Sequence, residues 1–271
     1  MSGSRNAISL FENYMRLAHV PKLEPDPAAD PRLYGKKLGL INAATWVQLW
    51  SYYFGRMYLP GVQLVNVGNE AVQLHFMRAF AQGLACPPPE NIEVFAQYAV
   101  QLVELAQVDA ILITCSTMNR SFPFVQQAVQ PFGVPVIQID QPLMKAAVLR
   151  GGRTLIVATV QTTVNNTRAM LLETAAAHGK LEDLQFSEAV AEEAFRLLGE
   201  GRIDDHNEAI ASQIRAAQAK EKIDQVVLAQ FSMSVFHLTY PEPEKAFGVP
   251  VLSSAAEGFH AVKQTLIELD K

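Results

Sequence analysis

Short apolar runs that end in small polar residues alternate with longer helix-forming stretches along most of the chain. Eight runs have the length and composition of strands buried on both faces: 37–42, 63–67, 109–114, 134–139, 153–158, 184–186, 224–229 and 249–252. The stretches between them, such as 92–105, 168–177 and 207–219, have the apolar spacing and the residue types of helices. This alternation predicts an α/β fold in which parallel strands are covered by helices on both faces.

The second half of the chain repeats the first. Segment 109–118 (DAILITCSTM) aligns with 224–233 (DQVVLAQFSM), and GVPV at 133–136 recurs at 248–251, both at an offset of 115 residues. Segment 35–42 (GKKLGLIN) aligns with 152–159 (GRTLIVAT) at an offset of 117. Three matches in the same order indicate an internal duplication. We therefore expect two similar parallel-sheet α/β halves, related by pseudo-twofold symmetry, with the site in the cleft between them.

The repeat also predicts the domain organisation. Residues 1–34 match neither repeat and are expected to be an N-terminal extension, with an amphipathic helix at 8–18 and a proline-rich connector after it. The first α/β half is expected at 35–145 and the second at 146–254. A last helix, within 255–271, is expected to return to the first half.

Composition and motifs exclude several classes of protein. Hydrophobic residues make up 49% of the 271 residues and charged residues 18%, which is typical of a folded globular protein. The net charge of −5 and the lack of a basic block argue against nucleic acid or an anionic membrane as partner. No apolar run is long enough to span a membrane, and the first residues lack the pattern of a secretion signal. Only two cysteines occur, Cys86 and Cys115, so we expect a cytoplasmic protein without disulfides. The motifs of nucleotide, zinc and serine-hydrolase sites are absent from the sequence, and no two histidines are spaced three or four residues apart, so a nucleotide site, a metal site and a serine-hydrolase site are not expected.

The residues that follow the strands are the candidates for chemistry, because ligands bind at the carboxyl ends of parallel strands. Cys115 follows the third strand at a turn into a helix, where N–H groups lower the pKa of a thiol. Its thiolate is a candidate nucleophile or proton acceptor and donor; the alternative is a buried, inert cysteine. Small hydroxylic side chains and helix N-termini suit a carboxylate. The candidate substrate-binding residues are Asn42, Ser116, Thr117, Thr159, Thr162, Thr163, Gln230, Phe231 and Ser232.

Segments 108–119 (VDAILITCSTMN), 223–234 (IDQVVLAQFSMS) and 249–262 (VPVLSSAAEGFHAV) resemble the aspartate/glutamate/hydantoin racemase superfamily, which also includes maleate isomerase and arylmalonate decarboxylase. The resemblance extends over about residues 35–269. It implies cofactor-independent proton transfer at the carbon next to the carboxylate of a small acid. A homo-oligomer, a dimer, is also expected.

In the racemases of this superfamily, one cysteine from each half takes part in the proton transfer. The first maps onto Cys115; the second maps onto Gln230, or onto Phe231 if the turn is shifted by one residue. Neither Gln nor Phe exchanges a proton at neutral pH. Several readings therefore stay open. They are a racemase with another second base, for which His237 is a candidate; a single-cysteine decarboxylase; thiol addition to a double bond; and a non-catalytic carboxylate-binding protein.

An aromatic cluster follows the first strand and also has two readings. It consists of Trp46, Trp50, Tyr52, Tyr53 and Phe54. The cluster is expected either to pack its helix against the sheet or to form a hydrophobic wall for a bulkier substrate.

Overall fold

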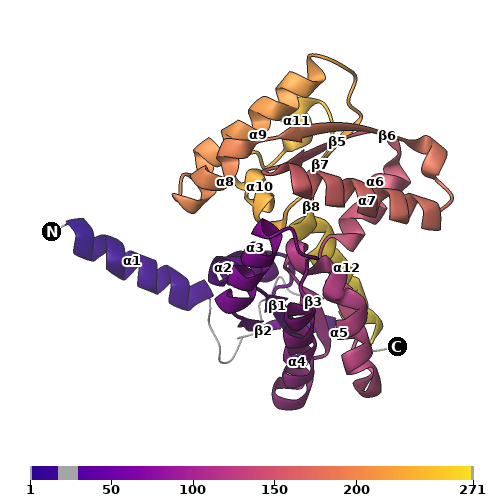
Figure 1. Ribbon diagram of the computed structural model, residues 1–271. Helices are drawn as coiled ribbons and strands as arrows, with labels where there is room; N and C mark the ends of the chain where they lie inside the picture. The colour runs from indigo at the N-terminus through magenta and orange to yellow at the C-terminus, as the bar shows by residue number, and fades with distance from the viewer. Residues whose placement is uncertain (1, 18–29, 270–271) are drawn as a thin grey trace. The chain divides into compact units, whose positions relative to one another are not determined.

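The computed structural model describes residues 2–17 and 30–269, which belong to two α/β units (Figure 1). Unit 1 comprises residues 1–138 and 259–271, and unit 2 comprises residues 139–258. The proline-rich connector predicted after residue 18 lies mostly outside the described residues. No helix within 2–17 and 30–269 has the length and hydropathy needed to span a membrane.

Unit 1 holds a four-stranded parallel sheet with the strand order β2-β1-β3-β4. Its strands are β1 (Lys37–Asn42), β2 (Gln63–Gly68), β3 (Ala110–Ile113) and β4 (Val136–Gln138). Its helices are α1 (Ser2–Leu17), α2 (Thr45–Tyr58), α3 (Glu70–Ala81), α4 (Pro89–Ala106), α5 (Phe122–Val129) and most of α12 (Ser254–Glu268), with short 3-10 helices η1 (Pro31–Leu33), η2 (Ser116–Ser121) and η3 (Gln130–Phe132).

Unit 2 has the same topology, with the strand order β6-β5-β7-β8 and all neighbours parallel. Its strands are β5 (Gly152–Ala158), β6 (Leu184–Val190), β7 (Gln225–Leu228) and β8 (Val251–Ser253). Its helices are α6 (Gln141–Arg150), α7 (Gln161–Ala177), α8 (Glu192–Gly199), α9 (Ile203–Gln218), α10 (Phe236–Thr239) and α11 (Pro243–Phe247), with 3-10 helices η4 (Leu181–Asp183) and η5 (Phe231–Val235). The prediction of two similar parallel-sheet α/β halves is therefore confirmed.

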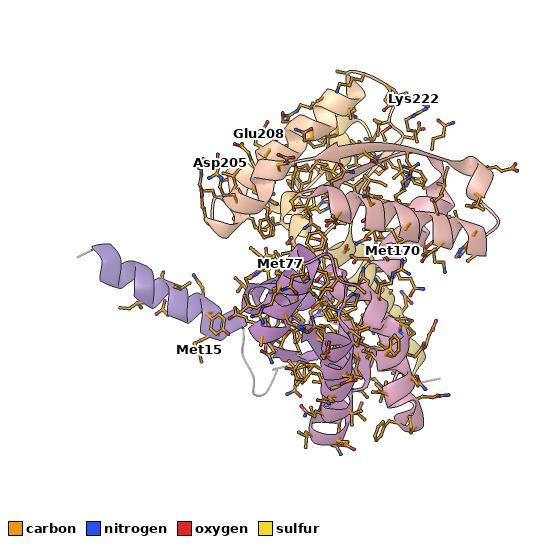
Figure 2. All side chains as sticks on the ribbon, viewed as in Figure 1. Met15, Met77, Met170, Asp205, Glu208 and Lys222 are labelled. Carbon is orange, nitrogen blue, oxygen red and sulfur yellow. The ribbon has the colours of Figure 1, made fainter. Side chains whose placement is uncertain are left out.

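The central strands β3 and β7 are buried along their whole length because helices cover both faces of each sheet, whereas the edge strands β2 and β6 include polar and partly exposed residues. In unit 2, Leu155 and Val157 of β5 pack with α8 and α9, whereas Ile156 and Ala158 pack with α6 and α7. In the same unit, α9 presents a charged outer surface that includes Asp205 and Glu208 (Figure 2). Alternate residues of one strand thus belong to two different cores, which explains why the sequence shows continuous apolar runs.

In unit 1, α4 and α5 cover one face of the sheet, and α2 with the C-terminal part of α12 belongs to the other. Ile111 and Ile113 pack with Phe95 of α4 in one core cluster, to which Cys115 also belongs. The ring of Tyr58 on α2 stacks on Phe259 of α12, with centroids 6.2 Å apart. The last helix therefore contributes to the core of unit 1.

The strand register shows how the two halves correspond. Leu38 pairs with Ala110 in unit 1, and Thr154 pairs with Gln225 in unit 2. The third strands are thus offset by 115 residues, as the sequence indicates, but the first strands are offset by 116. The alignment of the first strands at 117 is wrong by one residue, because matching glycines in the preceding turns is a weaker constraint than matching buried positions in the strands.

One pair of hydrogen bonds is repeated between the halves at these offsets. The backbone N–H of Lys37 donates to Asp109 Oδ2 (2.7 Å), and the backbone N–H of Arg153 donates to Asp224 Oδ2 (2.8 Å). Each aspartate precedes a central strand, and its carboxylate accepts a hydrogen bond from a backbone N–H near the start of the neighbouring strand. The duplication is therefore preserved in specific polar contacts as well as in the sheet order.

The two ends of unit 2 lie against each other. The hydroxyl of Ser254 donates to Asp140 Oδ1, and both residues are buried. A Cβ atom placed on Gly258 would stand 2.8 Å from the backbone oxygen of Ile139. Glycine at position 258 is therefore needed for this close approach between α12 and the chain entering α6.

Candidate active site

Cys115 lies where β3 ends and η2 begins, as the sequence predicts. Its side chain is 6% exposed, and its sulfur lies 3.2 Å from Thr117 Oγ1. The backbone N–H groups of Met118, Ala43 and Thr117 also donate to this sulfur. Since Ile41 pairs with Ile113, the residues that follow β1 lie beside those that follow β3, which brings the N–H of Ala43 to the thiol.

Burial nevertheless raises the pKa of the Cys115 thiol above its ordinary value. The hydroxyl of Thr117 and the three backbone N–H groups act in the opposite direction, because they stabilise the thiolate, but their sum is smaller than the cost of desolvation. The predicted donors are thus present, whereas the predicted net lowering of the pKa is wrong. The resting group is a protonated thiol with donors already directed at the sulfur.

The other candidates of the first half lie near the same strand ends. Asn42 is fully buried, its Nδ2 donates to Asn66 Oδ1 (3.1 Å), and its Oδ1 has no partner among the described residues. Ser116 is half-buried and Thr117 is exposed. Asn42 thus has a buried side-chain oxygen that accepts no hydrogen bond from the described residues.

Gln230 occupies in unit 2 the position that Cys115 occupies in unit 1. Both residues precede the 3-10 helix that follows the central strand. The Gln230 Oε1 accepts hydrogen bonds from the backbone N–H of Thr159 (2.9 Å) and from its hydroxyl (2.8 Å). At the offset of 116, Thr159 corresponds to Ala43, so the same backbone N–H meets a sulfur in one half and an amide oxygen in the other.

The segment after Gln230 is held against α9. Phe231 and Ser232 are buried, at 3% and 7% exposure. Farther along, Asn207 Nδ2 donates to the Val235 carbonyl (3.0 Å) and to Thr239 Oγ1 (2.8 Å). These contacts fix η5 and α10, and with them the backbone that carries Gln230.

The N-termini of α2 and α7 correspond in the two halves. Both begin after an extended residue, Ala44 and Val160, that makes no side-chain capping hydrogen bond. The first N–H groups of such a helix are available to an anion. Thr162 is exposed and Thr163 is half-buried in the first turn of α7.

His237 and the aromatic cluster lie on helices. Burial lowers the pKa of His237, and its Nε2 has no hydrogen-bond partner among the described residues. The ring lies edge-on to Phe236 at 6.2 Å. In the cluster on α2, Phe54 is 1% exposed while Trp46 is 42% exposed, so the helix has both a packed and an open aromatic side.

Ser51 and Thr114 form a buried polar link beside Cys115 that sequence reasoning missed. The hydroxyl of Ser51 lies 3.1 Å from Thr114 Oγ1, and Thr114 in turn donates to the Ile41 carbonyl (3.3 Å). Ser51 is in the middle of α2, where nothing in its local pattern distinguishes it from a surface serine. Only the packing of α2 over β3 reveals the contact.

The described residues thus form two α/β halves with the same strand order, and a cysteine follows the central strand of the first half. The sequence model for the family described as Asp/Glu/Hydantoin racemase matches residues 70–262. The chain belongs to this family. A search of curated protein sequences finds no match.

Solved structures with the same fold agree with this family. Glutamate racemase isoform RacE1 from Bacillus anthracis is 18% identical with a TM-score of 0.58, covering 87% of this chain and 83% of that one. An aspartate racemase homologue from Pyrococcus horikoshii is 19% identical with a TM-score of 0.60, covering 86% and 98%. Allantoin racemase from Klebsiella pneumoniae is 18% identical with a TM-score of 0.59, covering 87% and 89%. At these identities the likeness establishes the fold.

Proposed function

We propose that this chain is a cofactor-independent enzyme of the isomerase type that moves a proton at the carbon next to the carboxylate of a small acid, with Cys115 as the proton-transfer group. The observation that carries the proposal is the convergence of three backbone N–H groups and the Thr117 hydroxyl on the Cys115 sulfur. Such donors stabilise a thiolate more strongly than a thiol, so they favour the form of Cys115 that takes a proton.

In the proposed reaction, the Cys115 thiolate takes the proton from the α-carbon, and the electron pair of that C–H bond moves into the carboxyl group to give an enediolate. For inversion, a water molecule on the opposite face then donates a proton to the same carbon, and the Cys115 thiol gives its proton to the hydroxide so formed, which regenerates the thiolate. In unit 1, Asn42 and the N–H groups at the start of α2 are proposed to bind the carboxylate. In unit 2, the corresponding candidates are Thr159, Ser232 and the N–H groups at the start of α7. The chemistry needs no cofactor in this scheme.

A decarboxylase is the second candidate, and two observations favour it. Burial keeps Cys115 protonated at rest, and Gln230 stands where a second proton-transfer group is expected. In this reaction the bond to a departing CO2 breaks, its electron pair forms an enediolate, and the Cys115 thiol donates its proton to the carbon. One thiol is sufficient for that sequence.

An NMR experiment in D2O separates these functions. Aspartate, glutamate, allantoin, 5-methylhydantoin, maleate and phenylmalonate are incubated with the wild type, with Cys115→Ala and with Cys86→Ala as the matched control. We expect deuterium incorporation or CO2 loss with the wild type and Cys86→Ala, and none with Cys115→Ala. Exchange without inversion indicates one-base chemistry, and CO2 loss indicates the decarboxylase. Turnover that survives Cys115→Ala contradicts the proposal, and ligand-induced stabilisation without turnover favours a binding protein.

We further propose that the chain acts as a homodimer in the cytoplasm. Leu74, Met77 and Phe80 on α3 are exposed apolar side chains of the kind that protein interfaces cover (Figure 2 labels Met77). The two cysteines are free thiols, which suits a reducing compartment. Light scattering that gives the monomer mass at micromolar concentration contradicts the dimer.

A further inference from the structure

Two buried hydroxyl groups join the ends of segment 42–46, which leads from the end of β1 into the first turn of α2. Before this segment, the Ile41 carbonyl accepts hydrogen bonds from the Thr114 hydroxyl (3.3 Å) and from the Thr114 backbone N–H (3.0 Å). After it, the Val47 carbonyl accepts a hydrogen bond from the Ser51 hydroxyl (2.8 Å). The two hydroxyls lie 3.1 Å apart, so a continuous hydroxyl link runs from Val47 to Ile41.

Segment 42–46 carries one of the donors to the Cys115 sulfur. In a parallel pair of strands, the N–H groups that face the neighbouring strand recur at every second residue. Ile41 faces β3, so the next such N–H is that of Ala43, and this N–H donates to the sulfur. Its direction therefore depends on where segment 42–46 lies relative to the end of β3, and the hydroxyl link joins these two parts of unit 1.

The hydroxyl link lies entirely inside the protein. Ser51 is 0% exposed and Thr114 is 1% exposed. Burial of a hydroxyl costs free energy unless it is hydrogen-bonded, and each of these can donate once and accept as well. Alanine and valine in their places would pack without that requirement, so apolar packing does not explain the pair.

Unit 2 forms the same fold without this link. At the offset of 115 residues Ala229 takes the place of Thr114, and its backbone N–H donates to the Val157 carbonyl at 2.9 Å. The backbone contact is thus kept while the side-chain hydroxyl is absent. The half without the hydroxyl is also the half in which Gln230 follows the strand in place of Cys115. Within this chain the hydroxyl accompanies the thiol and is not needed for the sheet.

We propose that Ser51 and Thr114 are positioning residues whose hydroxyls hold segment 42–46 against the end of β3 and so keep the Ala43 N–H directed at the Cys115 sulfur. Neither residue exchanges a proton in the reaction. The inference rests on the proposed function for its consequence in turnover, whereas its effect on the thiol can be measured without a substrate. All of its contacts lie within unit 1.

Loss of the hydroxyl link should lower the thiolate fraction of Cys115. A donor that moves away from the sulfur stabilises the thiolate less, so the pKa of Cys115, already raised by burial, should rise further. We expect Ser51→Ala and Thr114→Val each to raise this pKa by about 0.5–1, which lowers the thiolate fraction about three- to tenfold at pH 8. Thr114→Ser keeps the hydroxyl and should restore the wild-type fraction.

Alkylation of Cys115 by iodoacetamide, in the Cys86→Ser background, separates this role from a purely structural one by the sign of the effect. If the hydroxyls only supported packing, their loss would expose the buried thiol and alkylation would become faster. If they direct a donor, alkylation becomes slower, about three- to tenfold at pH 8, because only the thiolate reacts. Rates at or above the wild-type rate in both Ser51→Ala and Thr114→Val overturn the inference.

Three further variants control this measurement. Thr265→Val removes a hydroxyl that also donates to the carbonyl four residues earlier (3.0 Å), but in α12, and should keep the wild-type rate. The double variant Ser51→Ala/Thr114→Val should be no slower than the slower single variant, because both hydroxyls act in one link; multiplied effects contradict the link. Thr114→Ser should react at the wild-type rate, and a rate as low as that of Thr114→Val contradicts the role of the hydroxyl. Alanine favours the helix at position 51, so Ser51→Ala decides the test if Thr114→Val does not fold.

The two proposals fail in different ways. If alkylation slows in the variants but the wild type turns over none of the six acids, the enzyme function fails and the positioning role stands. If turnover depends on Cys115 while alkylation and turnover are unchanged in Ser51→Ala and Thr114→Val, the proposed function stands and the positioning role is wrong.

Discussion

The alkylation of Cys115 should increase steeply with pH and reach no plateau below pH 9. Burial raises the pKa of this thiol above its ordinary value of 9.0. A thiol with the ordinary value is about 1% thiolate at pH 7, and the fraction for Cys115 is smaller still. Because only the thiolate reacts with iodoacetamide, the rate should rise about tenfold for each pH unit between 7 and 9.

The assay uses Cys86→Ser as the background, because Cys86 and Cys115 are the only cysteines of the sequence. The rate constant for modification is measured by mass spectrometry across the pH range. Thr117→Val serves as a second variant: loss of the hydroxyl 3.2 Å from the sulfur removes one stabilising donor and should lower the rate at each pH. A titration midpoint near or below pH 7 would refute the conclusion that burial outweighs the four donors.

Three further predictions concern stability and are checked by urea denaturation. Asn207→Leu removes one buried and one partly buried hydrogen bond that hold the segment after Gln230, so the free energy of unfolding should fall by about 1–3 kcal/mol; no change in the midpoint would mean that the segment is held by other contacts. Burial lowers the pKa of His206 below 6.5, so the unfolded chain takes up a proton first as the pH falls, and stability decreases by at most about 1.4 kcal/mol per pH unit. His206→Gln should make the loss of stability between pH 7 and pH 5 shallower, and an identical slope in both proteins would contradict this. A Cβ on Gly68 would stand 2.9 Å from the backbone oxygen of Asn42, so Gly68→Ala should destabilise the protein by roughly 1–3 kcal/mol, and a wild-type midpoint would show that β1 and β2 can separate without cost.

The fold was accessible from the sequence because burial on both faces makes the central strands apolar along their length. The predicted run at 37–42 coincides with β1, and the other seven runs each contain or overlap a strand. Helix boundaries were less accessible: α4 starts at Pro89, before the predicted residue 92, because a proline is accommodated in the first turn whether or not the next residues are apolar. The first strands were aligned with an error of one residue because apolar strands match at neighbouring offsets almost equally well.

The candidate site was accessible only in part. The position of Cys115 after β3 and its correspondence to Gln230 follow from the repeat, but the direction of the pKa shift does not, because the depth of a side chain is a property of the folded packing. The hydrogen bonds from Thr159 to Gln230 could not be predicted either, since they join residues 71 positions apart in the sequence. These bonds make the Gln230 Oε1 the acceptor for both the backbone N–H and the hydroxyl of Thr159.

The contact between Ile139 and Gly258 has a consequence for synthesis and engineering. Unit 2 is one continuous segment whose ends meet, so all of its strands and helices can assemble as soon as residue 258 has left the ribosome. Unit 1 is interrupted and must wait for α12, whose Phe259 completes the stack with Tyr58. The half that is made second is therefore the one that can finish folding first, and excision of residues 139–258 with a short linker between 138 and 259 offers a direct route to each half as a separate protein.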